Sequence, residues 1–488
     1  MNERLIRRIN REQMCWRAVD VERLIGEEHP ARAIWELVGK LDLDRFYERI
    51  ESNAEEGGRP ANDPRLLISL WVYAYSQGIG SAREVGRRCE WEPAFQWLTG
   101  CEEVNYHTLA DFRVEQREEL DELFTQVLGL LSAEGWIKLE QVMQDGTKIK
   151  AQASGRSFRR EDRIREHLER ARRQVAEMGD PQAEGESNRV RAARKRARRE
   201  RQERLERALQ ELEKLRTEKQ GKRAKDRAQV SVSDAEARRM RQADGGFAPS
   251  YNVQISADGA QGLIVGVQVV QERNDSQQLL PAVERITARL GNKPRQMMAD
   301  GDYTNCNNVE AMVAAEVDYL GSLRPSGAER DMTGSGRFPN GLFTYDAEDD
   351  QYICPQGKRL RYQEQEKRKG VSYRRYEARF ADCRDCPLKP QCCPQNRSRG
   401  RGILRAEPSP VVEAFRQKMA TAEAQTQYRR RARTVEFCHA WIKSKLGIRQ
   451  FHVRGLIKVQ MEMMWACLTY NLQHWIRLRK LRTVLAPA

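Results

Sequence analysis

Residues 251–270 read YNVQISADGAQGLIVGVQVV, and this stretch decides the fold class of the 488-residue chain. Its first six residues alternate apolar and polar side chains, which is the period of a half-buried β-strand. Asp258-Gly259 is a turn signal, and the apolar run over residues 263–270 predicts the partner strand of a β-hairpin. We therefore expect a β-sheet near the middle of the chain.

Predicted elements on both sides of this hairpin complete a mixed sheet. Before it, Trp136-Ile-Lys-Leu-Glu-Gln-Val-Met-Gln144 predicts a strand that ends at Asp145-Gly146. After it, two helix–strand repeats and a long helix are predicted, in residues 276–290, 295–299, 305–315, 317–322 and 428–446. This order is that of a ribonuclease-H-like fold, in which helices cover a mixed sheet. We predict the α/β (α+β) fold class, with this core in residues 136–335 and 411–480.

Residues 1–135 have the pattern of an all-helical N-terminal domain. Apolar side chains recur at helical spacing over residues 64–75, and Asn62-Asp63-Pro64 is a helix start signal. Short helices joined by tight turns are typical of a helix-turn-helix-like DNA-binding module. The cations that we expect to be exposed there are Arg83, Arg87 and Arg88. A helical domain that serves only for packing is the alternative interpretation.

The positive charge of the chain is concentrated in two segments. The whole sequence carries 86 Lys and Arg against 71 Asp and Glu, a net charge of +15. Residues 156–228 contain 25 Lys and Arg against 15 Asp and Glu, and residues 356–405 contain 15 against 5. Each segment therefore has a net charge of +10, and the rest of the chain sums to about −5. This balance favours a polyanionic partner that contacts two attachments of a slightly acidic core.

The first basic segment predicts a helical hairpin inserted at residues 156–230. Its composition is helical, its apolar side chains are sparse, and Gly179-Asp180-Pro181 divides it. We predict two antiparallel helices that protrude from the core, and a solvated arm without a partner is the alternative. The second basic segment predicts a polar, Cys-rich insert at residues 336–410, with little apolar core of its own.

The sequence lacks the apolar segments of membrane and secreted proteins. It contains no run of about 18 apolar residues, which a membrane-spanning helix requires. Its start, MNERLIRRINREQ, has no apolar region of the kind found in signal peptides. We therefore expect a cytoplasmic protein with no membrane partner. Its 11 Cys are expected to be reduced thiols, with clustered ones as metal ligands.

Five cysteines of the second insert have the spacing of a metal site. Cys383-Arg-Asp-Cys386 is a CxxC pair, with Cys354 before it and Cys392-Cys393 after it. Four thiolates can hold Zn²⁺ in a tetrahedral site, and such an ion would staple a small polar insert. The predicted ligands are Cys354, Cys383, Cys386 and one of Cys392 or Cys393. Reduced cysteines without a metal are the alternative.

Two aspartates follow predicted strands of the core. Asp145 closes the first strand and Asp300 closes the strand at residues 295–299. Since the ends of adjacent central strands lie side by side, both carboxylates are positioned to bind one divalent ion. Oxygen ligands suit Mg²⁺ or Mn²⁺. Asp302 is a rival for Asp300, which we favour because it follows the strand directly.

The long helix near the C-terminus supplies a third carboxylate, Glu436. With three acids the site holds two metal ions about 3.5–4 Å apart, one on each side of a phosphodiester. Glu436 competes with Glu423, which lies further from a cluster of cations over residues 428–433. Lys443 is seven residues after Glu436 and shares its helix face, where it is placed to grip a phosphate.

These residues resemble the motifs of the DDE transposases of bacterial insertion sequences. The run from Tyr428 through Arg431 and Glu436 to Lys443 resembles their Tyr-Arg-Glu-Lys signature. Val142-Met-Gln-Asp-Gly-Thr-Lys-Ile-Lys-Ala151 looks like the motif of the first aspartate, and Ala299-Asp-Gly-Asp-Tyr303 like that of the second. Motifs similar to the helical N-terminal domain of this branch are Asn62-Asp-Pro-Arg-Leu-Leu67 and His107-Thr-Leu-Ala-Asp-Phe-Arg113. The resemblance covers roughly residues 20–478.

The resemblance implies a catalytic triad of Asp145, Asp300 and Glu436 that binds Mg²⁺ or Mn²⁺. It also implies an enzyme that binds the terminal inverted repeats, cleaves the DNA ends and joins the 3′-hydroxyl ends to target DNA. The spacing before Glu436 is one residue longer than in the commonest signature, so Arg433 competes with Arg431 as a phosphate contact. The implied DNA contacts are Tyr428, Arg431, Arg433, Lys443 and Arg454.

Such enzymes usually act as homodimers on paired DNA ends, associate with the nucleoid when bound to DNA and use no small-molecule cofactor. Two other functions stay open. One is a DNA-binding transposase remnant whose catalytic site has decayed. The other is a ribonuclease-H-like DNA nuclease without strand transfer.

Overall fold

The computed structural model divides the chain into two compact units. Unit 1 comprises Met1–Phe124, Lys445–Ile448 and Met464–Ala488, and unit 2 comprises Thr125–Ser444 and Arg449–Met463. The predicted domain boundaries stay predictions. The structure describes residues 11–12, 14, 18–51, 60–177, 188–218, 221–323, 338, 340–368, 371–394, 398–406 and 409–485.

The N-terminal region is helical, as predicted. Its short first helix, η1 (Val21–Leu24), is followed by α1 (Pro30–Val38), α2 (Asp44–Tyr47), α3 (Pro64–Ser76), α4 (Ala82–Trp91), α5 (Pro93–Thr99), α6 (Tyr106–Glu115) and α7 (Arg117–Ala133). Helix α3 begins at the predicted signal, because the Asp63 side chain accepts the backbone N–H of Arg65 at 2.8 Å and Pro64 occupies the first turn. Its Trp71 is fully buried, and the indole donates a hydrogen bond to the carbonyl of Leu109 at 3.0 Å.

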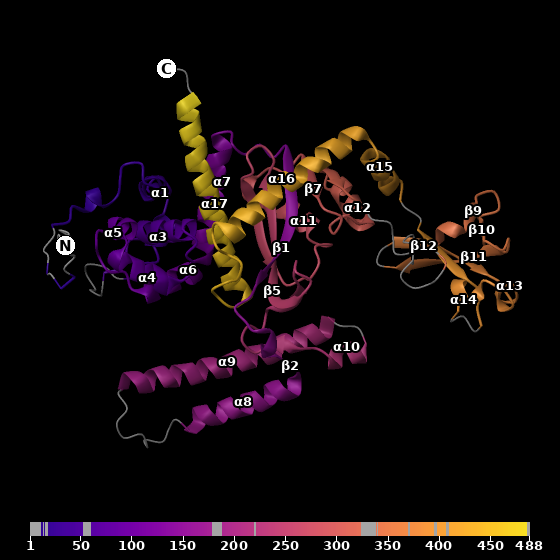
Figure 1. Cartoon of the computed structure of the whole chain (residues 1–488), viewed down its shortest axis with the longest axis horizontal. Helices are drawn as coiled ribbons and strands as arrows, with labels where there is room; N and C mark the ends of the chain where they lie inside the picture. The colour runs from indigo at the N-terminus through magenta and orange to yellow at the C-terminus, as the bar shows by residue number, and fades with distance from the viewer. Residues whose placement is uncertain are drawn as a thin grey trace, which may run out of the picture. The chain divides into compact units, whose positions relative to one another are not determined.

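A mixed six-stranded sheet forms the centre of unit 2 (Figure 1). Its strands are β1 (Gln141–Lys150), β4 (Arg238–Arg241), β5 (Phe247–Asp258), β6 (Ile264–Val270), β7 (Gln296–Ala299) and β8 (Asp318–Gly321). Five of them lie in the order β6-β5-β1-β7-β8, and β4 pairs with β5 as well. Strands β1, β5 and β6 run antiparallel, whereas β1, β7 and β8 run parallel. This is the predicted ribonuclease-H-like arrangement.

The first strand differs from its prediction. It begins at Gln141 instead of Trp136, and it continues through Asp145 to Lys150. Asp145 therefore lies within the ladder, opposite Ile255, and Asp145-Gly146 is not a turn. The reason is the length of β5, which offers partners for the whole segment up to the pair Lys150–Ser250.

Helices cover both faces of the sheet. In unit 2 they are α11 (Leu279–Leu290), α12 (Cys306–Ala314), α15 (Pro410–Met419) and α16 (Ala422–Ser444). The last helix, α17 (Leu456–Leu485), belongs to unit 2 up to Met463 and to unit 1 from Met464. Helix α16 crosses the face of β1 that carries Asp145, because its Lys443 donates to the Thr147 hydroxyl there. Ile286 of α11 lies beside Gly266 and Ser256 on the opposite face. No helix within the described ranges is long and apolar enough to cross a membrane.

The first basic segment forms the predicted helical hairpin. Its elements are β2 (Phe158–Arg159), α8 (Glu161–Ala176), α9 (Asn188–Glu218), α10 (Lys222–Asp226) and β3 (Val230–Ser231). The long helices are antiparallel, since Arg216 pairs with Glu161 while Arg172 pairs with Glu206. They pack through a cluster of eight buried residues: Ile164, Leu168, Ala171, Leu205, Ala208, Leu212, Ala228 and Val230. The predicted break at Gly179-Asp180-Pro181 lies outside the described residues.

The Cys-rich segment forms a second, antiparallel sheet. Its strands are β9 (Thr344–Asp346), β10 (Gln351–Ile353), β11 (Arg359–Arg368), β12 (Val371–Ala378) and β13 (Gly402–Ala406). They lie in the order β13-β12-β11-β10-β9 across the sheet. Two short helices, α13 (Phe380–Arg384) and α14 (Lys389–Cys392), contain Cys383 and Cys392. Cys386 and Cys393 lie just after these helices. It has more apolar core than predicted, because the strands bury Phe343, Leu360, Tyr376, Ala378 and Ile403 together.

Candidate active site and cysteine cluster

The register of β1 and β7 places the two predicted aspartates side by side. The strands are parallel, and Gln144 lies opposite Ala299. Asp145 and Asp300 are the residues that follow this pair along β1 and after β7, so they lie at the same level of the sheet. Asp302 is exposed in the turn beyond, where its backbone N–H donates to Asp300 Oδ1 at 2.9 Å. The adjacent pair is therefore Asp145 and Asp300.

The two carboxylates interact electrostatically. Burial, followed by the negative charge of Asp300, raises the pKa of Asp145 to about 6. The guanidinium of Arg431 and the backbone N–H of Gly146 act in the opposite direction, and the Gly146 N–H donates to Asp145 Oδ1 at 2.9 Å. Burial of Asp145 and the nearby negative charge of Asp300 are both unfavourable to its carboxylate, and a bound cation would offset both.

Helix α16 brings three of the predicted DNA-contacting residues to these acids. The positive charge of Arg431 lowers the pKa of both Asp145 and Tyr428 against the raising effect of burial. The hydroxyl of Tyr428 accepts the backbone N–H of Ser322, and burial raises its pKa. Lys443 donates to Thr147, two residues after Asp145 on the same strand face, and burial lowers the pKa of its ammonium group.

The third predicted carboxylate lies apart from the other two. Glu436 and Arg433 are exposed on α16. The helix turns Val435, Cys438 and Ile442 toward the sheet, and one residue is a rotation of about 100°. Glu436 shares its face of α16 with Lys443, which reaches Thr147 beside Asp145, but the side chain of Glu436 itself is exposed. Within the described part of the chain, no group of three or more His, Cys, Asp or Glu side chains lies close enough together to hold a metal ion.

A further residue of α16 that approaches Asp145 is His439. Its Nε2 atom lies 3.6 Å from Asp145 Oδ2, and its side chain is 10% exposed. Neither ring nitrogen has a hydrogen-bond partner in the described structure. Burial, followed by the charge of Lys443, lowers the pKa of His439 to about 3. The sequence contained one signal for this position, because His439 stands one turn after the apolar residue Val435.

The opposite face of β1 carries a buried polar network that sequence reasoning missed. Gln144 donates to Gln254 at 2.9 Å, and the Tyr303 hydroxyl donates to the same Gln254 oxygen. Gln254 in turn donates to Asp275 at 2.6 Å, and the charge of Asp275 also raises the pKa of Asp145. Gly146 is required here, since a Cβ atom on it would lie 2.5 Å from Asp275 Oδ1.

Arg454, the remaining predicted DNA contact, lies elsewhere in unit 2. It is exposed, and its Nε donates to the carbonyl of Gln152 at 3.0 Å. Burial lowers the pKa of Arg204 on α9, and the nearby positive charge of Arg454 lowers it further. Arg454 therefore lies close to Arg204 of the helical hairpin.

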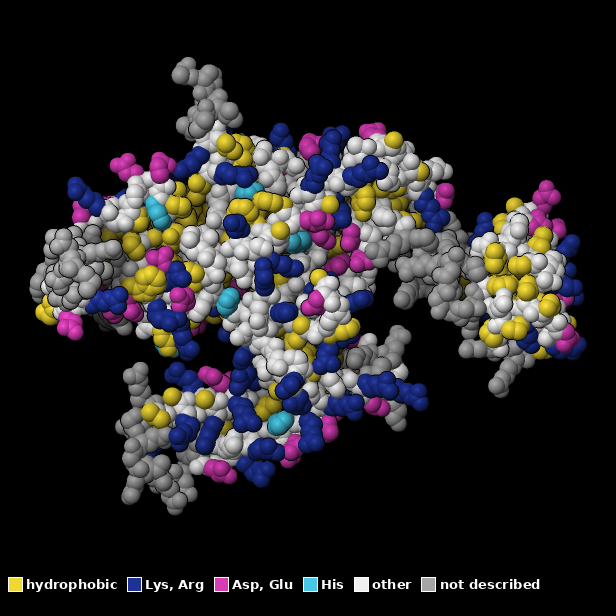
Figure 2. Space-filling view, viewed as in Figure 1, with side chains coloured by type: hydrophobic (Ala, Val, Ile, Leu, Met, Phe, Trp, Pro, Cys, Tyr) yellow, Lys and Arg dark blue, Asp and Glu magenta, His cyan; other side chains and the backbone are white. Residues whose placement is uncertain are grey.

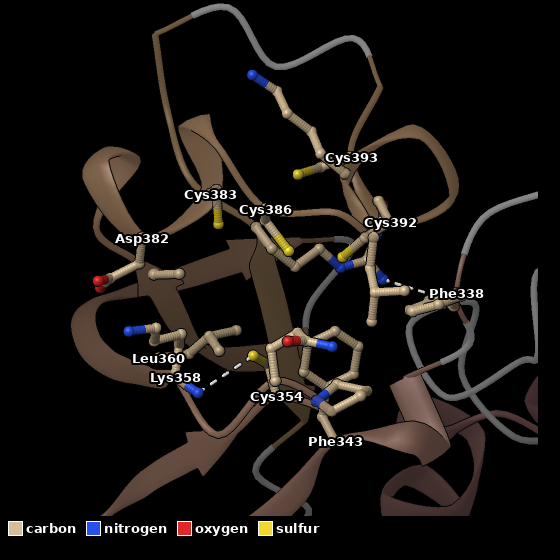
Figure 3. Close-up of a pocket in the computed structure, with 16 residues that line it drawn as sticks. Phe338, Phe343, Cys354, Lys358, Leu360, Asp382, Cys383, Cys386, Cys392 and Cys393 are labelled. Atoms are coloured by element: carbon tan, nitrogen blue, oxygen red, sulfur yellow. Dashed lines mark hydrogen bonds between the residues drawn. The ribbon is translucent and has the colours of Figure 1, made fainter.

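All five predicted cysteine candidates line one pocket of the second sheet (Figure 3). Cys354 lies in a tight turn after β10, where the Lys358 backbone N–H donates to its Sγ at 3.3 Å. Cys383 and Cys386 come from α13 and the turn after it, and Cys392 ends α14. Their thiols surround the pocket without reaching the closeness of a metal cluster.

The thiols of this pocket interact with one another. Burial raises the pKa of Cys392 to about 12, and burial also raises that of Cys383. Cys393 is buried and shares thiol hydrogen bonds with both of them. The backbone N–H of Arg401 donates to Cys383, and this contact favours the thiolate form. The structure thus places Cys392 and Cys393 at the same pocket and leaves both as candidates.

Comparisons with known proteins point to one class. The model of a transposase DDE domain matches residues 353–476, and that of a transposase domain (DUF772) matches residues 19–115. A cryo-EM structure of the piggyBac transposase synaptic complex with hairpin DNA aligns with 94% of this chain and 75% of that one, at 7% identity. Its TM-score of 0.31 is too low to establish a common fold. No curated protein matches the chain. The two family matches support a DDE transposase of an insertion-sequence type, in agreement with the resemblance.

Proposed function

We propose that this transposase binds the terminal inverted repeats of an insertion sequence, cleaves the DNA ends and joins the 3′-hydroxyl ends to target DNA. The observation that carries the proposal is the pair Asp145 and Asp300 on adjacent parallel strands. Cationic residues of α16 stand beside the pair, as a phosphodiester substrate requires. We also propose that the protein acts as a homodimer on paired DNA ends, in the cytoplasm or on the nucleoid.

The two aspartates fit a divalent metal ion. Both ligands are carboxylate oxygens, which Mg²⁺ and Mn²⁺ prefer. The raised pKa of Asp145 records burial and repulsion from Asp300, and a bound cation offsets both. When bound, such ions supply activation of the attacking hydroxyl and stabilisation of the leaving oxygen. Glu436 is proposed as the third ligand, on the family's motif.

The chain's own residues hold the DNA in this scheme. Arg431 and Lys443 contact the phosphates on either side of the scissile bond, and Tyr428 positions the strand between them. Arg433 and Arg454 extend the contact along the backbone. Since Lys443 is partly buried beside Asp145, it holds its phosphate close to the reacting group.

Two displacements complete the reaction. In the first, a water oxygen bonds to phosphorus and the bond from phosphorus to the 3′ oxygen breaks, which leaves a 3′-hydroxyl on the transposon end. In the second, that 3′ oxygen bonds to a phosphorus of target DNA, and the target's own 3′ oxygen departs. The attacking group loses a proton in each step and the leaving oxygen gains one.

The test uses a linear duplex that carries the inverted repeats flanking the gene. The wild-type chain is expected to nick the repeat ends in Mn²⁺ and to join pre-cut ends to a target plasmid, whereas the chelator EDTA abolishes both. Glu436→Gln tests whether Glu436 is the third metal ligand. Cleavage by this variant at the wild-type rate would show that Glu436 is not part of the site. DNA binding without nicking indicates a decayed remnant, and nicking without joining indicates a nuclease.

We also propose a structural Zn²⁺ held by Cys354, Cys383, Cys386 and one of Cys392 or Cys393. Backbone N–H groups already donate to the sulfurs of Cys354 and Cys383, as they do for thiolate ligands. The ion would have to draw the thiols closer than they lie now. Elemental analysis is expected to find about one Zn per chain, and none in a Cys383→Ser/Cys386→Ser variant.

A further inference from the structure

The two halves of α9 differ in charge. Residues 188–201 contain eight Lys and Arg and a single acid, Glu200. Residues 202–218 contain four Lys and Arg against five Glu. Figure 2 shows Lys and Arg side chains gathered along the helical hairpin. One half of this helix is therefore strongly cationic, and the other is nearly neutral.

The apolar packing of the hairpin involves only the neutral half. Leu205, Ala208 and Leu212 of α9 belong to the buried cluster, whereas residues 190–201 contribute no buried side chain. Polar contacts hold the cationic half to α8, since Arg198 donates to the carbonyl of Gln174 at 2.9 Å. Neighbouring like charges on a helix destabilise it, so this composition is not explained by folding.

Three cations of the cationic half form a row. Arg191, Lys195 and Arg199 are exposed and follow one another at intervals of four residues, about 6 Å apart along the helix. None of the three makes an ion pair with another described residue. In contrast, three exposed cations in the rest of the hairpin are paired: Arg163 with Glu166, Arg207 with Glu203 and Lys214 with Glu211.

We propose that residues 188–201 of α9 bind the phosphate backbone of duplex DNA without regard to base sequence. Duplex DNA carries about one negative charge per 1.7 Å of its axis, so it matches a row of unpaired cations. Binding there is expected to release counterions and to weaken steeply as salt rises. The inference deepens the proposed function, since it adds a contact outside the catalytic site.

The experiment compares two variants of the full chain. Arg191→Gln/Lys195→Gln/Arg199→Gln removes the unpaired row, and Arg163→Gln/Arg207→Gln/Lys214→Gln removes three exposed but paired cations of the same hairpin. Binding to a labelled 30-base-pair duplex without repeat sequences is followed by fluorescence anisotropy over a range of KCl concentrations. Circular dichroism checks that both variants keep their helix content.

The first variant is expected to bind about 10- to 100-fold more weakly at 0.1 M salt and to lose about two to three from the slope of log K against log salt. The control variant is expected to stay within about threefold of the wild type. Equal binding by the first variant and the wild type overturns the inference but leaves end cleavage intact. Preference for a duplex RNA or for anionic vesicles over DNA overturns it as well.

A second observation concerns His439. It is buried, both ring nitrogens lack partners in the described structure, and one of them lies 3.6 Å from Asp145. A buried polar group without a partner is costly, and such groups are retained where they serve a function. A small rotation would let Nε2–H donate to the carboxylate.

We infer that His439 is a positioning residue that orients the carboxylate of Asp145 toward Asp300. In the described structure the carboxylate of Asp145 accepts a hydrogen bond from the backbone N–H of Gly146, and Arg431 acts on it only through its charge. Partners of this kind fix ligand orientation, and their loss typically lowers metal affinity about 10- to 100-fold. The inference rests on the proposed function, because it assumes a metal ion at Asp145.

The test measures Mn²⁺ affinity of the full chain by electron paramagnetic resonance, so it needs no turnover. His439→Leu is expected to bind Mn²⁺ about 10- to 100-fold more weakly, and His439→Gln, which keeps a donor, is expected to restore most of the affinity. Cys438→Ala is the control, since Cys438 is buried on the same helix but contacts the carbonyl of Gly262.

Equal Mn²⁺ affinity in His439→Leu and the wild type overturns the inference. An equal loss in Cys438→Ala overturns it too, because the effect would then come from packing alone. Asp145→Asn distinguishes a failure of the role of His439 from a failure of the metal site itself. If that variant keeps the wild-type affinity, the metal site itself is wrong and the role of His439 fails with it.

Discussion

The interior of unit 1 and the centre of the sheet in unit 2 are built from different side chains. Unit 1 buries aromatic residues against each other, such as Trp71 and Tyr75, whose rings lie 5.4 Å apart. The sheet instead buries the network of Gln144, Gln254 and Asp275 behind Asp145. Apolar burial stabilises the first region, whereas the second holds repelling carboxylates in place. The interior of unit 1 is therefore mainly apolar, whereas the sheet of unit 2 combines buried apolar residues such as Ile255 and Met298 with the polar groups behind Asp145.

The largest expected effect is at the acidic pair. Asp300→Asn should lower the rate of end cleavage at least about 10³-fold, because it removes one carboxylate of the metal site. The same change should leave the thermal midpoint of the chain unchanged or higher, since it also removes the charge that repels Asp145. Gel-based cleavage and calorimetry measure the two effects. A large loss of stability would show that the pair is a structural contact.

Trp71→Ala tests the other side of the comparison. The indole is fully buried and donates to Leu109, so its loss should cost about 3–5 kcal/mol of unfolding free energy. Urea denaturation followed by circular dichroism measures this cost. The Mn²⁺ affinity of the remaining folded protein should not change, because Trp71 belongs to unit 1 and the acids to unit 2. A changed affinity would contradict this expectation.

Gly146→Ala should affect stability and chemistry together. The added Cβ would lie 2.5 Å from Asp275 Oδ1 and 2.7 Å from Gln254 Nε2, so the network must shift. Overpacking of this kind costs about 1–3 kcal/mol. Because Gly146 adjoins Asp145, the shift should also weaken Mn²⁺ binding. Gly129→Ala is a suitable control, since nothing lies within 4 Å of its Cβ position.

The smallest expected effect is a pH dependence in unit 1. Burial, followed by the charge of Arg477, lowers the pKa of His474 to about 4 from 6.5. The folded state therefore binds fewer protons, so this contribution to stability is complete above pH 6.5 and is lost as the pH falls toward 4. Between pH 7 and pH 5 the expected loss of unfolding free energy is about 1–2 kcal/mol. His474→Gln should flatten the dependence of the thermal midpoint between pH 7 and 5, and an unchanged slope would refute this.

Much of the fold could be predicted because it depends on local patterns. Alternating and periodic apolar residues predicted the central hairpin, the helical N-terminal region and the order of strands. The span of β1 was wrong, because the length of a strand depends on its partner, and β5 extends far enough to pair Lys150. The apolar core of the Cys-rich sheet was underestimated, since Leu360 and Ile403 lie on strands far apart in sequence.

The order of elements along the chain was enough to predict that Asp145 and Asp300 lie at neighbouring strands, because the strand order follows from that succession. The sequence by itself also determined where the cations and the cysteines gather. The side of α16 that meets Asp145, in contrast, follows from how the helix packs on the sheet. One residue turns a helix by about 100°, so the docking of Val435, Cys438 and Ile442 on the sheet brings His439 to the acid and leaves Glu436 exposed. That rotation is set by packing against the sheet, which no local pattern specifies.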